Sequence, residues 1–329
     1  MAGVPLASLV REPRYEQTPE TLTRILYDSL SPEQKAVVCF DWNHVDPQRG
    51  LLRTFVANHW PVSPPSINSE FFNGTQRAII RETFESIVEP DWHSRLYQQL
   101  RDDSGGFGRD QQIAIFGVPG SEKFEFVLSG RHMTLRCDGD SADHVAFAGP
   151  IFYGHSAEGF FERRHHPSNV FWEQALAANA VYEMLDGRQR DLALIKGAMP
   201  AEDDVRFRGY DNGLPGIPVT ELLMDQKEEL QRVLRKLLEP YRKSDRDEVV
   251  RCLDVHGGLD ACNLAFYKQS DIGGDGVWDN WRLEGPAFVW YFRGRPHVHV
   301  WVHVADDPAV ELNAYSDLTL DRAGHSRFP

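Results

Sequence analysis

The stretch GPAFVWYFRGRPHVHVWVHV, residues 285–304, decides the fold that we expect for this chain. Its first part is rich in β-branched and aromatic residues, residues 293–296 have the composition of a turn, and its second part alternates with a period of two. This pattern predicts a β-hairpin. On the return strand the valines point to one face, and the other face carries His297, His299, Trp301 and His303.

Two histidines of this strand are close enough to bind one metal ion. At about 3.3 Å per residue, the Cα atoms of His297 and His299 lie about 6–7 Å apart, so both rings can reach the same ion. His303 lies two same-face positions further along and needs a sheet twist or a second site. Two other interpretations of this face remain open, namely a substrate-binding or acid/base surface and an ordinary solvated sheet face.

A β-meander is expected at residues 111–155, and it supplies a third histidine. Its predicted strands are Gln112–Phe116, Phe124–Leu128, Arg131–Cys137 and Val145–Phe147. In the third of these, His132 shares a face with Arg136. If this strand lies beside the hairpin, His132 joins His297 and His299, and three histidines can hold a catalytic metal with an open position.

The remainder of the chain indicates helices around this sheet. Thr18 and Ser31 each precede Pro-Glu, which is typical of a helix start. No composition shift, long linker or internal repeat is visible. We therefore expect one α+β domain over residues 1–329, with an antiparallel sheet, made of the central meander and the C-terminal hairpin, packed with helices. Its expected parts are an N-terminal arm at 1–17, helical parts at 18–110 and 168–256, the meander at 111–155 and the hairpin at 285–305.

Composition narrows the class of protein. Of the 329 residues, 41% are hydrophobic and 26% are charged, which is typical of a soluble globular protein. The net charge of −14 disfavours nonspecific binding to nucleic acid or to an anionic membrane. No apolar run is long enough to span a membrane, and the first residues lack the pattern of a signal peptide. The four cysteines form no CxxC pair, so we expect a cytoplasmic protein with reduced thiols, and its oligomeric state stays open.

Further candidates follow if the histidines bind a metal. Arg131 and Arg136 can hold a substrate carboxylate through paired hydrogen bonds. Arg131 adjoins His132 and so points to the opposite face unless the strand bulges, which favours Arg136 for this role. The other candidates are Tyr153 and His155 as acid/base groups and Trp301 as a substrate contact.

The order of several segments resembles a bacterial family of domains of unknown function, number 3500. The segments that carry the resemblance are Ile115–Pro119, Leu128–Leu135, Pro150–Gly154, Gly216–Pro218 with the helix that follows, and Gly285–Pro286 with the late His-x-His. The resemblance as a whole covers residues 30–310. Arg131 stands where the family usually has the first of two histidines, and its later histidine corresponds to His299 or His303. The resemblance implies a shared fold and one site for His132 and the late histidines, but it implies no reaction.

The function expected first is therefore that of a metal-dependent enzyme. His132, His297 and His299, with His303 or a carboxylate as fourth member, suit copper, iron or zinc. Copper or iron indicates an oxidoreductase acting on a small molecule or peptide, which we favour because aromatic residues are expected around the site, namely Tyr153, Trp290, Tyr291 and Trp301. Zinc indicates a hydrolase. A metal-free ligand-binding module and an interaction protein without chemistry are the alternatives.

Overall fold

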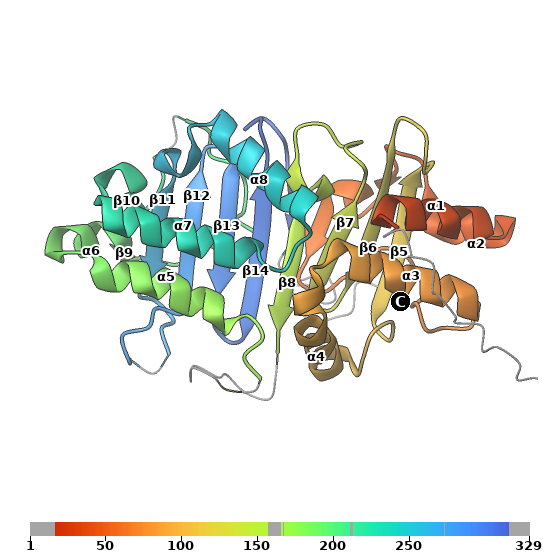
Figure 1. Cartoon of the computed structure of the whole chain (residues 1–329), viewed down its shortest axis with the longest axis horizontal. Helices are drawn as coiled ribbons and strands as arrows, with labels where there is room; N and C mark the ends of the chain where they lie inside the picture. The colour runs from red at the N-terminus through yellow and green to blue at the C-terminus, as the bar shows by residue number, and fades with distance from the viewer. Residues whose placement is uncertain (1–16, 157–165, 167, 211–212, 273, 316–329) are drawn as a thin grey trace, which may run out of the picture.

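The computed structural model describes residues 17–156, 166, 168–210, 213–272 and 274–315. In this part of the chain, eight α-helices lie on one face of a large sheet (Figure 1). The expected N-terminal arm falls, apart from residue 17, outside the described residues. The helices are α1 (Pro19–Ser29), α2 (Pro32–Val38), α3 (Gly74–Ile87), α4 (His93–Ser104), α5 (Trp172–Met184), α6 (Gly187–Ala193), α7 (Met224–Leu238) and α8 (Lys243–Val255).

Local sequence explains where the first helices begin. The hydroxyl of Thr18 accepts a hydrogen bond from the backbone of Thr21 at the start of α1. At the start of α2, Ser31 and Gln34 bond to each other's backbone in a capping box. Proline at the first helical position loses no hydrogen bond there. Both predicted helix starts are confirmed.

The sheet joins the meander and the hairpin, and it is mostly antiparallel. It has eleven strands in the order β1-β5-β6-β7-β8-β14-β13-β12-β11-β10, with β9 also paired to β11. Their bounds are β1 (Cys39–Phe40), β5 (Gln111–Gly117), β6 (Phe124–Gly130), β7 (Met133–Cys137), β8 (Ile151–His155), β9 (Leu194–Ile195), β10 (Ile217–Pro218), β11 (Asn263–Tyr267), β12 (Asn280–Gly285), β13 (Phe288–Arg293) and β14 (Val298–Val304).

The expected sheet was antiparallel throughout, but two short strand pairs near its edges are parallel. β1 pairs with β5 and β9 pairs with β11, and both pairs are parallel. Parallel neighbours need a long crossover between them, and the chain between each pair contains two helices. The fold is therefore mixed α/β, with an antiparallel centre and a parallel pair toward each edge.

The predicted hairpin is confirmed as β13 and β14, whereas the meander differs in two strands. β7 begins at Met133, because Arg131 and His132 form the turn that follows β6. The fourth strand is β8 rather than Val145–Phe147: Val145 makes only an isolated bridge to Ala305, and a 3₁₀ turn follows it.

The two halves of the chain repeat one order of elements. Two helices and a short strand (α1-α2-β1, then α5-α6-β9) are followed by two more helices and four antiparallel strands (α3-α4-β5 to β8, then α7-α8-β11 to β14). Even a buried contact recurs, because Gln34 and Gln76 exchange side-chain hydrogen bonds just as Gln189 and Gln226 do. The halves join where β8 pairs with β14. The repeat lies in the order of the elements and not in a visible repeat of the sequence.

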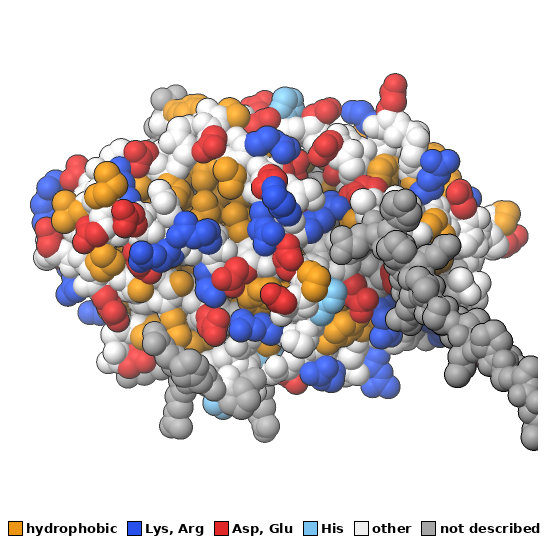
Figure 2. Space-filling view, in the orientation of Figure 1, with side chains coloured by type: hydrophobic (Ala, Val, Ile, Leu, Met, Phe, Trp, Pro, Cys, Tyr) orange, Lys and Arg blue, Asp and Glu red, His pale blue; other side chains and the backbone are white. Residues whose placement is uncertain are grey.

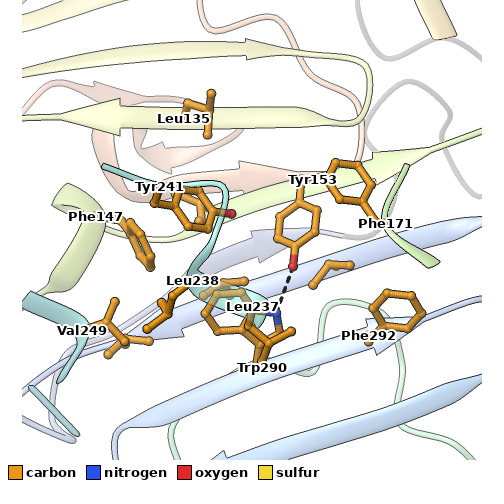
Figure 3. Close-up of a cluster of buried hydrophobic side chains, with 14 of the residues drawn as sticks. Leu135, Phe147, Tyr153, Phe171, Leu237, Leu238, Tyr241, Val249, Trp290 and Phe292 are labelled. Atoms are coloured by element: carbon orange, nitrogen blue, oxygen red, sulfur yellow. Dashed lines mark hydrogen bonds between the residues drawn. The ribbon is translucent and has the colours of Figure 1, made fainter. Parts of the chain in front are cut away.

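The two faces of the sheet are covered differently. The helix face forms the main core, part of which Figure 3 shows around Tyr153, Trp290 and Tyr241. The other face is covered by irregular segments, including residues 52–62 and 199–207. Small two-stranded sheets lie within or beside these segments, formed by β2 (Val45–Asp46) with β3 (Gly50–Leu51) and by β4 (Phe55–Ala57) with β15 (Asn313–Tyr315). Basic and acidic side chains alternate over the outer surface of the helices (Figure 2).

Candidate metal centre

Three histidines meet where the two halves of the chain join. His299 lies near the start of β14, His297 directly precedes this strand, and His132 lies in the turn between β6 and β7. The Nε2 atom of His132 is 3.2 Å from that of His297 and 3.1 Å from that of His299. One ligand atom from each of the three residues lies within 4.8 Å of the others, so the group could hold a metal ion.

The backbone of His132 has an unusual conformation that belongs to this turn. Its φ is +54°, in the left-handed region that residues other than glycine seldom adopt. Its N–H donates to the carbonyl of Asn58 at 2.9 Å, and its own carbonyl accepts from the N–H of Gly154 at 3.1 Å. These two bonds hold the turn against both a loop and β8. The corresponding turn of the second half, Gly285-Pro286-Ala287, carries no histidine.

Gly154 lies between the two sides of the cluster. The expectation that the His132 strand is the direct neighbour of the hairpin is wrong, since β8 separates them. Gly154 of β8 pairs with His299 on one side and bonds to His132 on the other. A Cβ at this position would lie 2.4 Å from the carbonyl oxygen of Val298 and 3.4 Å from both rings. The missing side chain therefore lets the two imidazoles meet across the strand.

Two carboxylates, one buried and one partly exposed, orient the rings from behind. The Nδ1 atom of His132 lies 2.9 Å from Oδ2 of Asp103, at the end of α4, and Nδ1 of His299 lies 2.7 Å from Oε1 of Glu202. If each Nδ1–H donates to its carboxylate, both Nε2 lone pairs face the cluster. Asp103 is itself held, because it accepts from the side chain of Gln99 and the backbone of Ser156, each at 2.8 Å.

The electrostatics of the cluster favour neutral imidazoles. Burial, with a contribution from the charge of His299, lowers the pKa of His132 to about 4 in spite of Asp103. Burial and the two neighbouring rings lower the pKa of His297 to about 3. Burial alone would raise the pKa values of Asp103 and Glu202, but the hydrogen bonds from their histidines outweigh it and lower both. The lowered pKa values keep His132 and His297 neutral near pH 7, which is the state in which histidine binds metals.

His303 lies apart from the other three histidines. The residue is 1% exposed, and its ring stacks on Phe207 at 4.2 Å between ring centroids. Neither ring nitrogen has a hydrogen-bond partner in the described part of the chain. The expectation that His303 adds a fourth ligand is therefore not met, since two more same-face positions along β14 carry it away from the cluster.

Arg136 and Trp301 face the same side of the sheet as the cluster but are not open to a substrate. Arg136 is fully buried, pairs with Glu125 at 2.6 Å and donates from Nε to the carbonyl of Pro150 at 2.6 Å. Trp301 is 1% exposed and packs edge-on against Phe152. The favoured role of Arg136 in holding a substrate carboxylate is thus corrected, because its guanidinium already bonds to groups in the interior of the protein.

Tyr153 and His155 lie on the opposite, helix face of β8. The hydroxyl of Tyr153 donates to Gln174 at 2.7 Å. It accepts a hydrogen bond from Trp290 at 3.0 Å (Figure 3). Burial raises the pKa of Tyr153. The ring of His155 pairs with Asp102 at 3.0 Å. Residues 153 and 155 alternate with residue 154, so neither side chain points at the cluster, and their expected acid/base role there is not supported.

Sequence reasoning missed three residues that shape the cluster, namely Gly154, Asp103 and Glu202. Only Gly154 carried a signal, because a glycine inside a strand often marks a close approach of other groups. The carboxylates lie far from the histidines in sequence, at the end of a helix and in a loop.

The fold and the cluster together define a mixed α/β protein with a three-histidine group at the junction of two similar halves. A family model matches residues 15–304, and the chain belongs to this family, described as a protein of unknown function (DUF3500). The expected family is thus confirmed. No curated protein and no solved structure matches the chain. Among the described residues, no helix has the length and apolar character required to cross a membrane.

Proposed function

We propose that the protein is a metal-dependent enzyme whose centre is formed by His132, His297 and His299. The observation that carries the proposal is the convergence of three Nε2 atoms, two of them on rings whose Nδ1 atoms face carboxylates. Carboxylate–histidine pairs of this kind orient the ligands of many metal sites. Three protein ligands leave at least one position of a four-coordinate ion open for water or substrate.

Two reaction classes fit this donor set. A zinc ion bound here would lower the pKa of its water toward about 7 and so support hydrolysis. Copper and iron accept the same imidazoles and would support oxidation of a small molecule or peptide. Tyr153 and Trp290 face the other side of the sheet. Only two of the four aromatic residues that favoured oxidation therefore remain on the side of the cluster. We therefore place the zinc-type hydrolase first.

The oxidoreductase remains a second candidate because of one aromatic contact. The ring of Phe152 lies 5.3 Å from that of His299 and 4.7 Å from that of Trp301, centroid to centroid. This row of rings leads from the cluster to Trp301 and would place aromatic side chains beside a redox-active metal.

Metal analysis of the purified protein, produced without added metal, tests the proposal. We expect near-stoichiometric zinc, copper or iron in the wild type and its loss in the His297→Ala/His299→Ala double variant. His144→Ala is the matched control, because this exposed histidine pairs with Asp306, which follows the end of β14 opposite to His297 and His299. Absence of metal from the wild type, persisting after reconstitution with each ion, would refute the proposal. The metal found then assigns the reaction class.

A further inference from the structure

We propose that Arg131 binds a carboxylate of the substrate beside the three-histidine centre. This inference rests on the proposed function and adds the chemical class of the substrate. It reverses the sequence-based preference between the two candidate arginines, because Arg136 is buried in an ion pair whereas Arg131 is partly exposed.

The turn places Arg131 directly beside the cluster. Arg131 and His132 are the two residues that connect β6 and β7, so the chain presents a guanidinium next to a ligand. The backbone of Arg131 forms an antiparallel bridge with His59. The charge of Arg131 is among the causes that lower the pKa values of both His132 and His297, as expected for a cation near both rings.

The guanidinium of Arg131 contains a buried donor that lacks an acceptor among the described residues. Its Nε atom is buried and has no hydrogen-bond partner in the part of the chain that the structure describes. Three carboxylates near the turn already have histidine partners. Asp103 bonds to His132, and Glu202 bonds to His299. Asp110 lies 3.1 Å from the ring of His59. A buried donor without a partner is costly, and an anionic ligand would supply the missing acceptor.

The charges around the centre favour an anionic substrate, and the shape of the Arg131 guanidinium favours a carboxylate among anions. Both acids that support the centre lie behind the imidazoles, whereas a bound divalent cation and Arg131 would add positive charge on the substrate side. A guanidinium donates two parallel hydrogen bonds that match the two oxygens of a carboxylate. A substrate acid can thus be held by Arg131 with its reacting group at the open position of the centre.

Binding of acetate to the cobalt(II)-loaded protein, followed by visible absorption at fixed pH and ionic strength, tests this inference. We expect Arg131→Gln to weaken acetate binding about tenfold or more, the size of a charge-assisted hydrogen bond, and Arg131→Lys to recover part of the loss. Cobalt content should not change. Acetamide, which lacks the charge, should bind equally weakly to both proteins. Glycine peptides with free or amidated C termini then separate a small acid from the end of a peptide.

The matched control is Arg295→Gln, which removes an exposed arginine two residues before His297. It should change acetate affinity less than about twofold, since general electrostatic attraction at an exposed site is screened by salt. An unchanged affinity in Arg131→Gln, or an equal loss in Arg295→Gln, would overturn the role of Arg131 and leave the metal centre intact. Failure of the wild type to take up cobalt would instead refute the proposed function, and this inference with it.

Discussion

The Nε2 atoms of His132 and His299 lie 3.1 Å apart although the residues are separated by 167 positions in the chain. The two rings belong to different halves of the protein and meet over Gly154 of β8, which lies between the turn of His132 and strand β14. The centre therefore depends on the correct pairing of three backbone segments, namely the turn of His132, β8 and β14. A change in any of them should alter the metal affinity.

Replacing Gly154 by alanine should disrupt the centre. The added Cβ would lie 2.4 Å from the carbonyl oxygen of Val298, so β8 or β14 must shift. We expect a loss of about 1–3 kcal/mol in the free energy of unfolding, typical of overpacking, and weaker metal binding. Urea denaturation and metal titration measure the two effects. Gly187→Ala is the control, because nothing lies within 4 Å of its added Cβ and helix α6 tolerates alanine; equal metal affinity in both variants would contradict the prediction.

The carboxylates behind the rings should set metal affinity. Asp103→Asn and Glu202→Gln keep the size of the side chain but weaken its hold on the Nδ1–H of a histidine. We expect each to lower metal affinity about 10- to 100-fold, as for other residues that support metal ligands. Competition with a chromogenic chelator measures this.

The neighbouring Asp102 offers a control for Asp103. It lies in the same helix turn but pairs with His155 on the helix face of the sheet. Asp102→Asn should keep wild-type metal affinity. If it weakens binding as much as Asp103→Asn does, the effect belongs to the end of α4 in general and not to the carboxylate–histidine pair.

His303 should make the protein sensitive to acid. Burial, with the nearby charge of Arg136, lowers its pKa to about 3, whereas the unfolded chain has a histidine pKa near 6.5. Between these values the unfolded state binds a proton that the folded state does not, so stability falls as the pH falls from about 6.5 toward 3. In the metal-free protein, His303→Leu should make this loss shallower by up to about 1.4 kcal/mol per pH unit. Urea denaturation at several pH values tests it, and an unchanged slope would show that His303 does not contribute.

Arg136 should matter for stability and not for substrate binding. Removing it leaves Glu125 buried, and burial already raises the pKa of that carboxyl to about 7. We expect Arg136→Met to cost about 3–5 kcal/mol, the usual effect of breaking a buried ion pair. Adding Glu125→Gln should recover part of the loss. Denaturation of the single and double variants measures this, and a stable Arg136→Met protein with weakened acetate binding would restore the role first expected for Arg136.

Local pattern was enough to predict much of the fold. The alternation of β14, the turn before it and the starts of α1 and α2 follow from properties of adjacent residues, and the structure confirms them. The edge strands β1 and β9, two residues each, are too short to show a period. The fourth strand of the meander was missed because its segment is apolar on both faces, so that no alternation marks it.

By itself, the sequence determined which side of β14 carries histidines, since side chains of a strand alternate for steric reasons that need no partner. It also determined that His297 and His299 share that side. Only the tertiary structure decided that His132 reaches them and His303 does not, that Gly154 makes room between the rings, and that Asp103 and Glu202 stand behind two of them. The reason is physical: strand periodicity sets the direction of a side chain, whereas its neighbours are set by long-range pairing and by the loops that cover the sheet.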